Sequence, residues 1–404
     1  MQSTKISRVS VALCQAVPWR GAPQVTSSAA VTDRELVVVG GGVIGLTCAF
    51  EAAANGWRTT IIDRDPGHGA GWAAAGMLAP TAEAHFGEEA LVRLLVAGAQ
   101  AWPTFARDLA RQSQIDIGFE PTGTILVAKD GGDRAELRRI IELQRSLDLA
   151  VEDLRADDLR EMEPSLSPAL AGGALLPGDH QVSNRQLLAA LMDANEALDV
   201  TFLRDEAIRA SWGSQSATVD LASGRTLRTG ALLLCLGART SLIEAAIGHL
   251  PTVRPVKGHI LRLRSDEPLL GRTIRATVRG RSVYLVPRRD GELVVGATVE
   301  ERGFDERIQA GEVFSLLDDA RRILPGVDEL ELVDVSCGLR PATSTNAPMI
   351  ERIDDGPVLV ATGHYRNGIL LAPLTARIII SELEGTPDPA SALASAAGSR
   401  GDHR

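Results

Sequence analysis

The stretch Leu36–Asp63, which reads LVVVGGGVIGLTCAFEAAANGWRTTIID, decides the fold. An apolar run breaks into glycines, continues as a helix-forming segment, and returns as a second short apolar run that Asp63 closes. The glycines Gly40, Gly42 and Gly45 have the G-x-G-x-x-G spacing. In that spacing the first glycine permits a tight turn, the second lets the backbone approach a pyrophosphate, and the third lets helix and strand pack closely. The stretch therefore predicts a strand, a phosphate-binding turn, a helix and a second, parallel strand.

Two further features of this stretch suit a dinucleotide. The amides of Val43 and Ile44 begin the predicted helix, where unpaired N–H groups face a phosphate. Asp63 follows the second strand, at the position where a carboxylate accepts hydrogen bonds from ribose hydroxyls and disfavours a 2′-phosphate. The pattern does not separate NAD from FAD. A glycine-rich turn in an ordinary α/β sheet is the alternative interpretation.

The composition narrows the class of protein. The chain has 404 residues, of which 45% are hydrophobic and 23% charged, as is ordinary for a globular protein of about two domains. Its formal net charge of −10 predicts a small-molecule partner and no nucleic acid. No uninterrupted apolar run reaches the roughly 18 residues that a membrane span requires, so we expect no membrane anchor. A homo-oligomer is compatible with the sequence.

Cysteines and histidines bear on location and metal binding. The cysteines Cys14, Cys48, Cys235 and Cys337 include no C-x-x-C pair and are typical of free thiols in a reducing compartment, which predicts a cytoplasmic protein. The seven histidines have no metal-ligand spacing, so we expect no metal site. Residues 1–33 are rich in Ser, Thr and Ala with a few basic residues, and we interpret them as an N-terminal extension that is either disordered or targeting.

The pattern after Val200 changes to short strands. Between residues 256 and 298 the strands alternate in polarity, and two of them are joined through Asp290-Gly291, a strong hairpin pattern. This predicts an α/β fold in which a Rossmann-type cofactor-binding domain carries an inserted α+β substrate domain built on an antiparallel sheet. The expected limits are 34–113, 175–255 and 341–385 for the first domain, 114–174 and 256–340 for the second, and 386–404 for a flexible tail.

Three more segments are candidates for the cofactor site. The run Ala73–Ala79, AAAGMLA, is too apolar for a solvent loop, and its small side chains let backbone amides approach a flat ligand. The second segment is the end of the buried strand ALLLCLG, at Cys235 and Gly237. The third segment is the loop Gly363–Gly368, which leads into a helix. A helix N-terminus stabilises the negative charge of a reduced flavin by ~0.3 to 2 kcal/mol, which favours FAD over nicotinamide. The candidate cofactor residues of these segments are Ala74, Ala75, Gly76, Met77, Leu78, Cys235, Gly237, Gly363, His364, Arg366, Asn367, Gly368 and Ile369.

Six segments then point to a known family. In chain order they are GGGVIGL, AAAGMLAP, PVKGHILRLR, YLVPRRDGELVVGAT, CGLRP and ATGHYRNGILLAP, and together they resemble the glycine-oxidising members of the D-amino-acid oxidase family of FAD enzymes. The resemblance runs from about Glu35 to Glu384. It implies an oxidase that removes a hydride from the α-carbon of glycine, another small amine or a D-amino acid. The imine hydrolyses to an oxo acid and ammonia, O2 becomes H2O2, and a role in forming the thiazole of thiamine is implied as well.

The resemblance also implies roles for individual side chains. Arg340, in CGLRP, matches the family's arginine for the substrate carboxylate, and its planar guanidinium fits a carboxylate bidentately. Tyr284 matches the active-site tyrosine, and Arg366 matches a second arginine near the site. We interpret His364 as shaping the flavin loop, because hydride transfer from a neutral amine needs no strong base. The plainer alternatives are an acid-paired surface arginine for Arg340, a core aromatic for Tyr284 and an exposed loop arginine for Arg366.

The chain departs from the family pattern at three positions. Asp63 stands where a glutamate is commoner, Ser282 where we expect a histidine, and Val299 where we expect a methionine. The last two leave the preferred amine open. Cys337 lies near the place where related sarcosine oxidases attach their flavin, but one residue out of position, so we expect non-covalent FAD.

Three alternatives to an oxidase remain open at this point. They are a D-amino-acid or sarcosine-type dehydrogenase that uses an acceptor other than O2, a non-catalytic flavin-binding subunit, and an NAD dehydrogenase. Tyr284 and Arg340 together disfavour the non-catalytic subunit, because such a subunit has no need of both.

Overall fold

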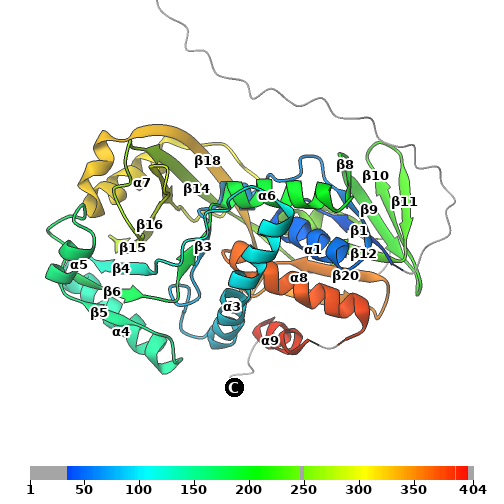
Figure 1. Ribbon diagram of the computed structural model, residues 1–404, viewed down its shortest axis with the longest axis horizontal. Coiled ribbons are helices and arrows are strands. Elements are labelled where there is room, and N and C mark those ends of the chain that lie inside the picture. Colours follow the sequence, from blue (N-terminus) through cyan, green and yellow to red (C-terminus); the bar gives the residue numbers. More distant parts are fainter. Residues whose placement is uncertain (1–33, 246–249, 387, 399–404) are drawn as a thin grey trace, which may run out of the picture. The chain divides into compact units, whose positions relative to one another are not determined.

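The computed structural model describes residues 34–245, 250–386 and 388–398 (Figure 1). The extension predicted for residues 1–33, including Cys14, lies outside these residues. The helices of the described ranges contain no apolar stretch long enough to cross a membrane.

A six-stranded sheet carries the glycine-rich turn. Its strand order is β19-β20-β12-β1-β2-β8. The strands span Glu35–Val39 (β1), Arg58–Ile62 (β2), Thr201–Leu203 (β8), Ala231–Leu234 (β12), Met349–Ile353 (β19) and Val358–Thr362 (β20). Strand β1 is parallel to both β2 and β12, and only the edge strand β19 is antiparallel to its neighbour. The parallel strands predicted from the opening stretch are therefore present.

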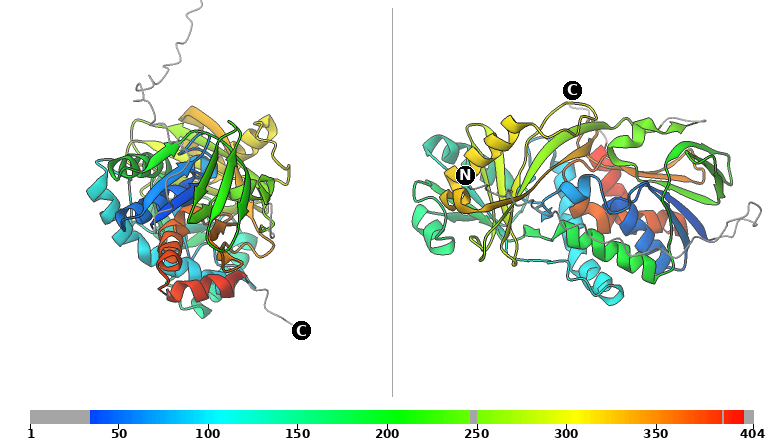
Figure 2. Two further views of the ribbon diagram at one scale, coloured as in Figure 1. Left: turned by 90° about the vertical axis from the view of Figure 1, so that its right-hand side faces the viewer. Right: turned by 90° about the horizontal axis from the view of Figure 1, so that it is seen from above.

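The apolar run of β1 is buried on both faces of this sheet. Leu36 and Val38 join a core formed with the helices, whereas Val37 and Val39 join a core formed with a second, four-stranded sheet. Successive side chains of a strand point to opposite faces, so a continuous apolar run requires two covering layers. The helices of the first layer are α1 (Val43–Ala54), α3 (Glu89–Gln112), α6 (Asn184–Ala197) and α8 (Gly368–Glu384). Figure 2 (left) turns the four-stranded sheet toward the viewer.

The four-stranded sheet is the outer layer on the other face. Its order is β11-β10-β9-β13. The strands span Ala207–Trp212 (β9), Ala217–Leu221 (β10), Thr226–Thr229 (β11) and Glu244–Ala245 (β13), and the 3₁₀ turn η1 (Gly237–Leu242) connects β12 to β13.

The third sheet has eight strands in the order β18-β14-β17-β16-β15-β4-β6-β5. They span Thr124–Ala128 (β4), Glu152–Leu154 (β5), Gly172–Leu176 (β6), Arg254–Arg264 (β14), Thr273–Val278 (β15), Arg281–Pro287 (β16), Glu292–Gly296 (β17) and Glu331–Ala342 (β18). The hairpin predicted at Asp290-Gly291 joins β16 to β17, which pair antiparallel. All neighbouring strands are antiparallel except β4 and β15.

Shorter elements complete the eight-stranded part. They are α4 (Gly131–Ser146), α5 (Ala156–Met162), α7 (Ala310–Ile323) and η2 (Pro325–Glu329). Helices α5 and α7 contribute Leu159, Leu316 and Ile323 to the core on one face of the sheet. The domain limits given above stay a prediction.

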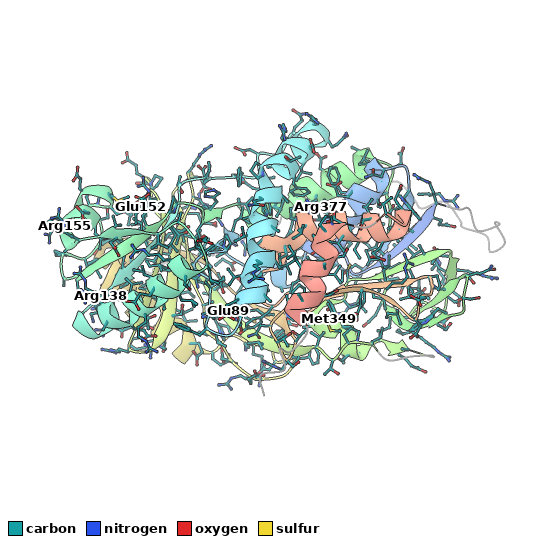
Figure 3. The ribbon with its side chains drawn as sticks, turned by 90° about the horizontal axis from the view of Figure 1, so that it is seen from below. Glu89, Arg138, Glu152, Arg155, Met349 and Arg377 are labelled. Carbon is teal, nitrogen blue, oxygen red and sulfur yellow. The ribbon has the colours of Figure 1, made fainter. Side chains whose placement is uncertain are left out.

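One expectation about the chain's end is wrong. Residues Pro389–Gly398 form helix α9 rather than part of a flexible tail. Ala390, Ala394 and Ala397 are buried on one face of α9, which packs on α3 and α8 (Figure 3). Arg377 of α8 fixes the start of α9, because its Nε lies 2.8 Å from Oδ2 of Asp388. The small alanines permit this close packing, and their low hydrophobicity makes the segment resemble a linker.

We predict that this helix stabilises the protein. Ala394→Glu buries a carboxylate against α3 and should lower the free energy of unfolding by more than about 2 kcal/mol. Ala392→Glu is the matched control, because Ala392 is exposed on the same helix and should change stability by less than about 0.5 kcal/mol. Urea unfolding measures both, and equal stability of the two variants would contradict the packing of α9.

Candidate active site

A cavity of about 730 Å³ opens where the two larger sheets meet the glycine-rich turn. This volume falls within the roughly 300–1,000 Å³ of small-molecule and cofactor sites. One end of the cavity is lined by the turn after β1 and by Asp63, and the other by Tyr284 and Arg340. The cavity therefore joins the predicted nucleotide site to the predicted reaction site.

The glycine-rich turn has room only for glycine at two of its three positions. A side chain at Gly40 would overlap the Cys235 carbonyl oxygen, and Gly40 also has a φ of +107°. A side chain at Gly45 would overlap the carbonyl oxygen of Gly40. Gly42 faces open space, and helix α1 begins directly after it at Val43. The turn thus presents a helix N-terminus to an open cradle, which suits an anion.

Asp63 is fixed at the end of β2. Its Oδ2 accepts a hydrogen bond from the Gly41 amide at 2.6 Å, and its Oδ1 accepts one from the Asp65 amide at 2.8 Å. Each carboxylate oxygen accepts more than one hydrogen bond, so both keep capacity for ribose hydroxyls. The glycine-rich turn therefore holds Asp63 in place, although its side chain is shorter than the glutamate that is commoner at this position.

The apolar run after α2 (Ala70–Ala73) forms one wall of the cavity. Ala74, Ala75, Gly76 and Met77 line it, and Met77 begins the short strand β3 (Met77–Leu78), which pairs with β7 (His180–Gln181). A side chain at Gly76 would overlap the Val182 carbonyl oxygen, and Gly76 has a φ of +75°. The position of the wall is therefore fixed by contacts on the side away from the cavity, with Val182 and strand β7.

The loop between β20 and α8 closes the opposite side. His364 is buried, and its Nε2 lies 3.0 Å from Oγ1 of Thr375. Burial lowers the pKa of His364 to about 3, so the ring is neutral at physiological pH. Tyr365, at a φ of +47°, donates its amide to the Pro341 carbonyl at 2.8 Å. His364 thus supports the loop and is unsuited to act as a base that cycles near neutral pH.

Two glycines make room for the side chains at the reaction end. The Arg340 guanidinium lies against Gly258 of β14, and the Tyr284 ring lies against Gly296 of β17, where any added side chain would overlap these groups. Gly296 is the cross-strand neighbour of Tyr284. The sequence pattern did not single out either glycine.

Arg340 is held without an acid. Its Nη1 donates to the carbonyl oxygens of Thr298 at 3.1 Å and Lys257 at 3.3 Å. Within the described ranges Arg340 forms no ion pair. The alternative interpretation, a surface arginine paired with an acid, therefore finds no support among these residues. The remaining N–H groups of the guanidinium are available to an anionic ligand.

Tyr284 lies beside this arginine as a neutral hydroxyl. Burial raises the pKa of Tyr284, and the positive charges of Arg340 and Arg275 only partly offset this effect. Its hydroxyl therefore stays protonated at neutral pH and is able to donate a hydrogen bond.

Arg366 belongs to a charge cluster that the sequence did not reveal. Glu83 contacts Arg275 through Oε1 at 2.7 Å and Arg366 through Oε2 at 3.1 Å. Burial opposes ionisation of Glu83, but the two arginines outweigh it and lower the pKa of Glu83 to about 2. Arg366 is an exposed residue of the loop, but its Nε pairs with Glu83, so its guanidinium is not free. Its Nη2 also lies 3.0 Å from Nε2 of His85.

The cavity brings together most of the predicted residues. Arg340, Tyr284 and Arg366 line it, and so do all the predicted cofactor residues except Gly45, Leu78 and Gly363, which lie behind its surface. Ser282 and Val299 also line the cavity. In the part of the chain that the structure describes, no group of three or more His, Cys, Asp or Glu side chains is arranged to hold a metal.

The cysteines of the described ranges are free thiols. Cys337 lines the cavity and donates to the Glu306 carbonyl at 2.9 Å. Burial raises the pKa of the Cys337 thiol, which disfavours its thiolate.

Comparisons with known proteins agree with this arrangement. Residues 35–382 match the family described as FAD dependent oxidoreductase. Glycine oxidase from Geobacillus kaustophilus is 34% identical over 354 residues, which cover 87% of this chain and 93% of that protein. The crystal structure of glycine oxidase from that organism superposes with a TM-score of 0.82 and covers 88% of this chain and 96% of the other.

A two-part protein is also similar. The bifunctional protein ThiO/ThiG from Trichormus variabilis is 31% identical over 347 residues, which cover 86% of this chain. The chain spans 52% of that protein's length.

We predict that His364 makes the protein sensitive to mild acid. Its pKa is about 6.5 in the unfolded chain and about 3 in the folded one, so the unfolded state binds one more proton between these values. The stability due to neutral His364 is complete above pH 6.5 and is lost as the pH falls from 6.5 toward 3. Urea unfolding of the FAD-loaded protein from pH 7.5 to 5.0 should show this decline.

His364→Gln keeps a group able to reach Thr375 but cannot titrate, so its stability should decline less steeply over that range. Equal slopes for wild type and His364→Gln would contradict the assignment.

Proposed function

The chain belongs to the family of FAD-dependent oxidoreductases, and we propose that its substrates are glycine and other small amines or D-amino acids. When bound, FAD takes a hydride from the substrate α-carbon and passes the electrons to O2, giving H2O2. The imine product hydrolyses to an oxo acid and ammonia. The observation that carries the proposal is the unpaired Arg340 guanidinium beside the neutral hydroxyl of Tyr284 in the FAD cavity.

The residues of the cavity fit FAD at both ends. Gly42 leaves open space before α1 for a pyrophosphate, and Asp63 has the remaining acceptor capacity for ribose. Between the ends, Ala75 and Gly76 line the cavity, and within the described chain their amide N–H groups have no hydrogen-bond partner. Buried donors without partners are rare in folded proteins, so these two suit acceptor atoms of a bound ligand.

Arg340 provides the binding energy for the substrate carboxylate. Its side chain is positioned by the two carbonyls of Thr298 and Lys257, which use one nitrogen and leave the rest of the fork for a carboxylate. Bidentate arginine–carboxylate contacts fix orientation as well as charge. Tyr284 adds a hydroxyl donor to the same carboxylate, and the two contacts together orient the α-carbon.

The residues around the substrate hold it rather than remove a proton. His364 is neutral and bonded to Thr375, and both oxygens of Glu83 face arginines. Neither group is free to accept a proton from the substrate. A neutral amine needs only orientation for hydride loss, so the amine reaches the site after losing its proton to solvent.

The thiol in the cavity supports non-covalent FAD. Cys337 is protonated because burial raises the pKa of its thiol, and its hydrogen donates to a backbone carbonyl. The likeness to glycine oxidases and to ThiO/ThiG supports a role for the imine in forming the thiazole of thiamine.

A peroxide-coupled assay tests the substrate class. FAD-loaded protein should form H2O2 with glycine and, to differing degrees, with sarcosine, D-alanine, D-proline or N-ethylglycine. Reduction of an artificial dye by one of these amines without peroxide would instead identify a dehydrogenase. Neither peroxide nor dye reduction with any of the five would refute the proposal.

We predict that Arg340→Ala raises the KM for glycine and lowers kcat/KM by tens- to thousands-fold, because loss of the fork costs about 2 to 5 kcal/mol. The flavin absorbance should stay unchanged. Arg264→Ala is the matched control, because Arg264 is on β14 of the same sheet, is 45% exposed and pairs with Asp290. An unchanged kcat/KM in Arg340→Ala would remove this residue from the site.

A further inference from the structure

A partly exposed arginine, Arg288, supports the alanine-rich wall on the side away from the cavity. Arg288, in the turn after β16, donates from Nη2 to the Ala75 carbonyl at 2.5 Å and from Nη1 to Oε1 of Gln181 at 2.5 Å. Its neighbour in space, Arg262, donates to the Ala74 carbonyl at 3.2 Å. Two consecutive carbonyls of the wall therefore face cationic side chains.

The geometry of the peptide bond fixes where the wall's N–H groups point. In a planar trans peptide the C=O and the following N–H point in opposite directions. The only cis peptide in the described ranges is Gly296-Ala297, so the Ala75-Gly76 peptide is trans. Because the Ala75 carbonyl faces Arg288, the amide of Gly76 points the other way, into the cavity that Gly76 lines. The same reasoning aims the Ala75 amide into the cavity.

The two arginines differ in how their charge is balanced. Arg262 has a carboxylate partner, Oε1 of Glu292, at 2.5 Å from its Nη1. No carboxylate of the described chain forms an ion pair with Arg288, whose Nε is buried and has no partner either. Burial, and then the charge of Arg262, lower the pKa of Arg288 to about 10, and the nearby charges of Glu292, Asp290 and Glu120 oppose this shift. Arg288 is therefore still cationic at neutral pH.

A largely buried cation without an ion-pair partner is costly for the folded protein, although the charges of Glu292, Asp290 and Glu120 offset part of that cost. The cost falls when negative charge arrives nearby, and reduction of bound FAD adds such charge. A cation that donates to a peptide carbonyl also polarises that peptide and strengthens the donor at its other end.

We propose that Arg288 is a positioning residue for FAD, which acts through the Ala75-Gly76 peptide to favour the reduced form of the cofactor. The amide of Gly76 donates to an acceptor atom of the flavin, and the charge of Arg288 strengthens that donation. The inference rests on FAD binding alone and is independent of the substrate.

The test compares the midpoint potential of bound FAD in wild type and variants, measured by dye equilibration during chemical reduction without substrate. Arg288→Gln should make the potential more negative. By linkage, reduced FAD should bind about tenfold more weakly relative to oxidised FAD. Arg288→Lys keeps the charge and should retain most of the wild-type potential, which a purely geometric role of the guanidinium would not predict.

Arg289→Gln is the matched control. Arg289 is the next residue, its side chain is 73% exposed, and it pairs with Glu120, so its loss should leave the potential unchanged. An unchanged potential in Arg288→Gln, or an equal fall in Arg289→Gln, would overturn the proposal.

A second variant should shift the midpoint potential in the opposite direction. It tests the role of charge even if Arg288→Gln fails to bind FAD. Glu292→Gln keeps an acceptor for Arg262 but removes the negative charge that balances it. The positive field behind the wall then grows, and the potential should become more positive. A more negative or unchanged potential in Glu292→Gln would contradict a role for charge at this position.

Discussion

The site depends on glycines that backbone or side-chain groups approach so closely that no β-carbon would fit. Gly45 rests against the carbonyl of Gly40, and this contact brings the N-terminus of α1 to the cavity. The same device recurs at the reaction end, where Arg340 and Tyr284 lie against Gly258 and Gly296. In each case a missing β-carbon lets a polar group occupy space beside the backbone. The cavity is therefore shaped from both ends by residues that have no side chain of their own.

Charge balance separates the arginines of the site into two kinds. Arg275 and Arg366 share Glu83, and Arg262 has Glu292, so these three brace the structure around the cavity. Arg340 and Arg288 have no carboxylate partner within the described chain. Although the whole protein carries a formal charge of −10, Arg340 lines the cavity and Arg288 lies behind one of its walls.

The sequence predicted those parts of the site that are formed by residues close together in the chain. The turn at Gly40–Gly45 and the hairpin at Asp290-Gly291 follow from a few adjacent residues, and the structure confirms both elements. Contacts between distant segments were not readable, because Glu83 looks like any surface acid until Arg275 and Arg366 are brought to it. Helix α9 was missed for a related reason: alanine and serine carry a weak apolar pattern, and the burial of its face depends on α3. The roles of Arg340 and Tyr284 came from family resemblance and not from pattern.

The site that we propose acts by placement and charge rather than by proton transfer. Among the described residues that line the cavity, the buried His364 is neutral and Glu83 is held ionised by two arginines, so neither is suited to cycle a proton near neutral pH. Two cations remain without an ion-pair partner in the described chain: Arg340, which we propose binds the carboxylate of the substrate, and Arg288, which we propose favours the charge that FAD gains on reduction. Both residues are only partly exposed, and a counter-charge near a partly buried cation is worth more than in water. Within the described chain Arg340 and Arg288 form no ion pair, which costs stability, and under our proposals each charge gains a counter-charge only when substrate is bound or FAD is reduced.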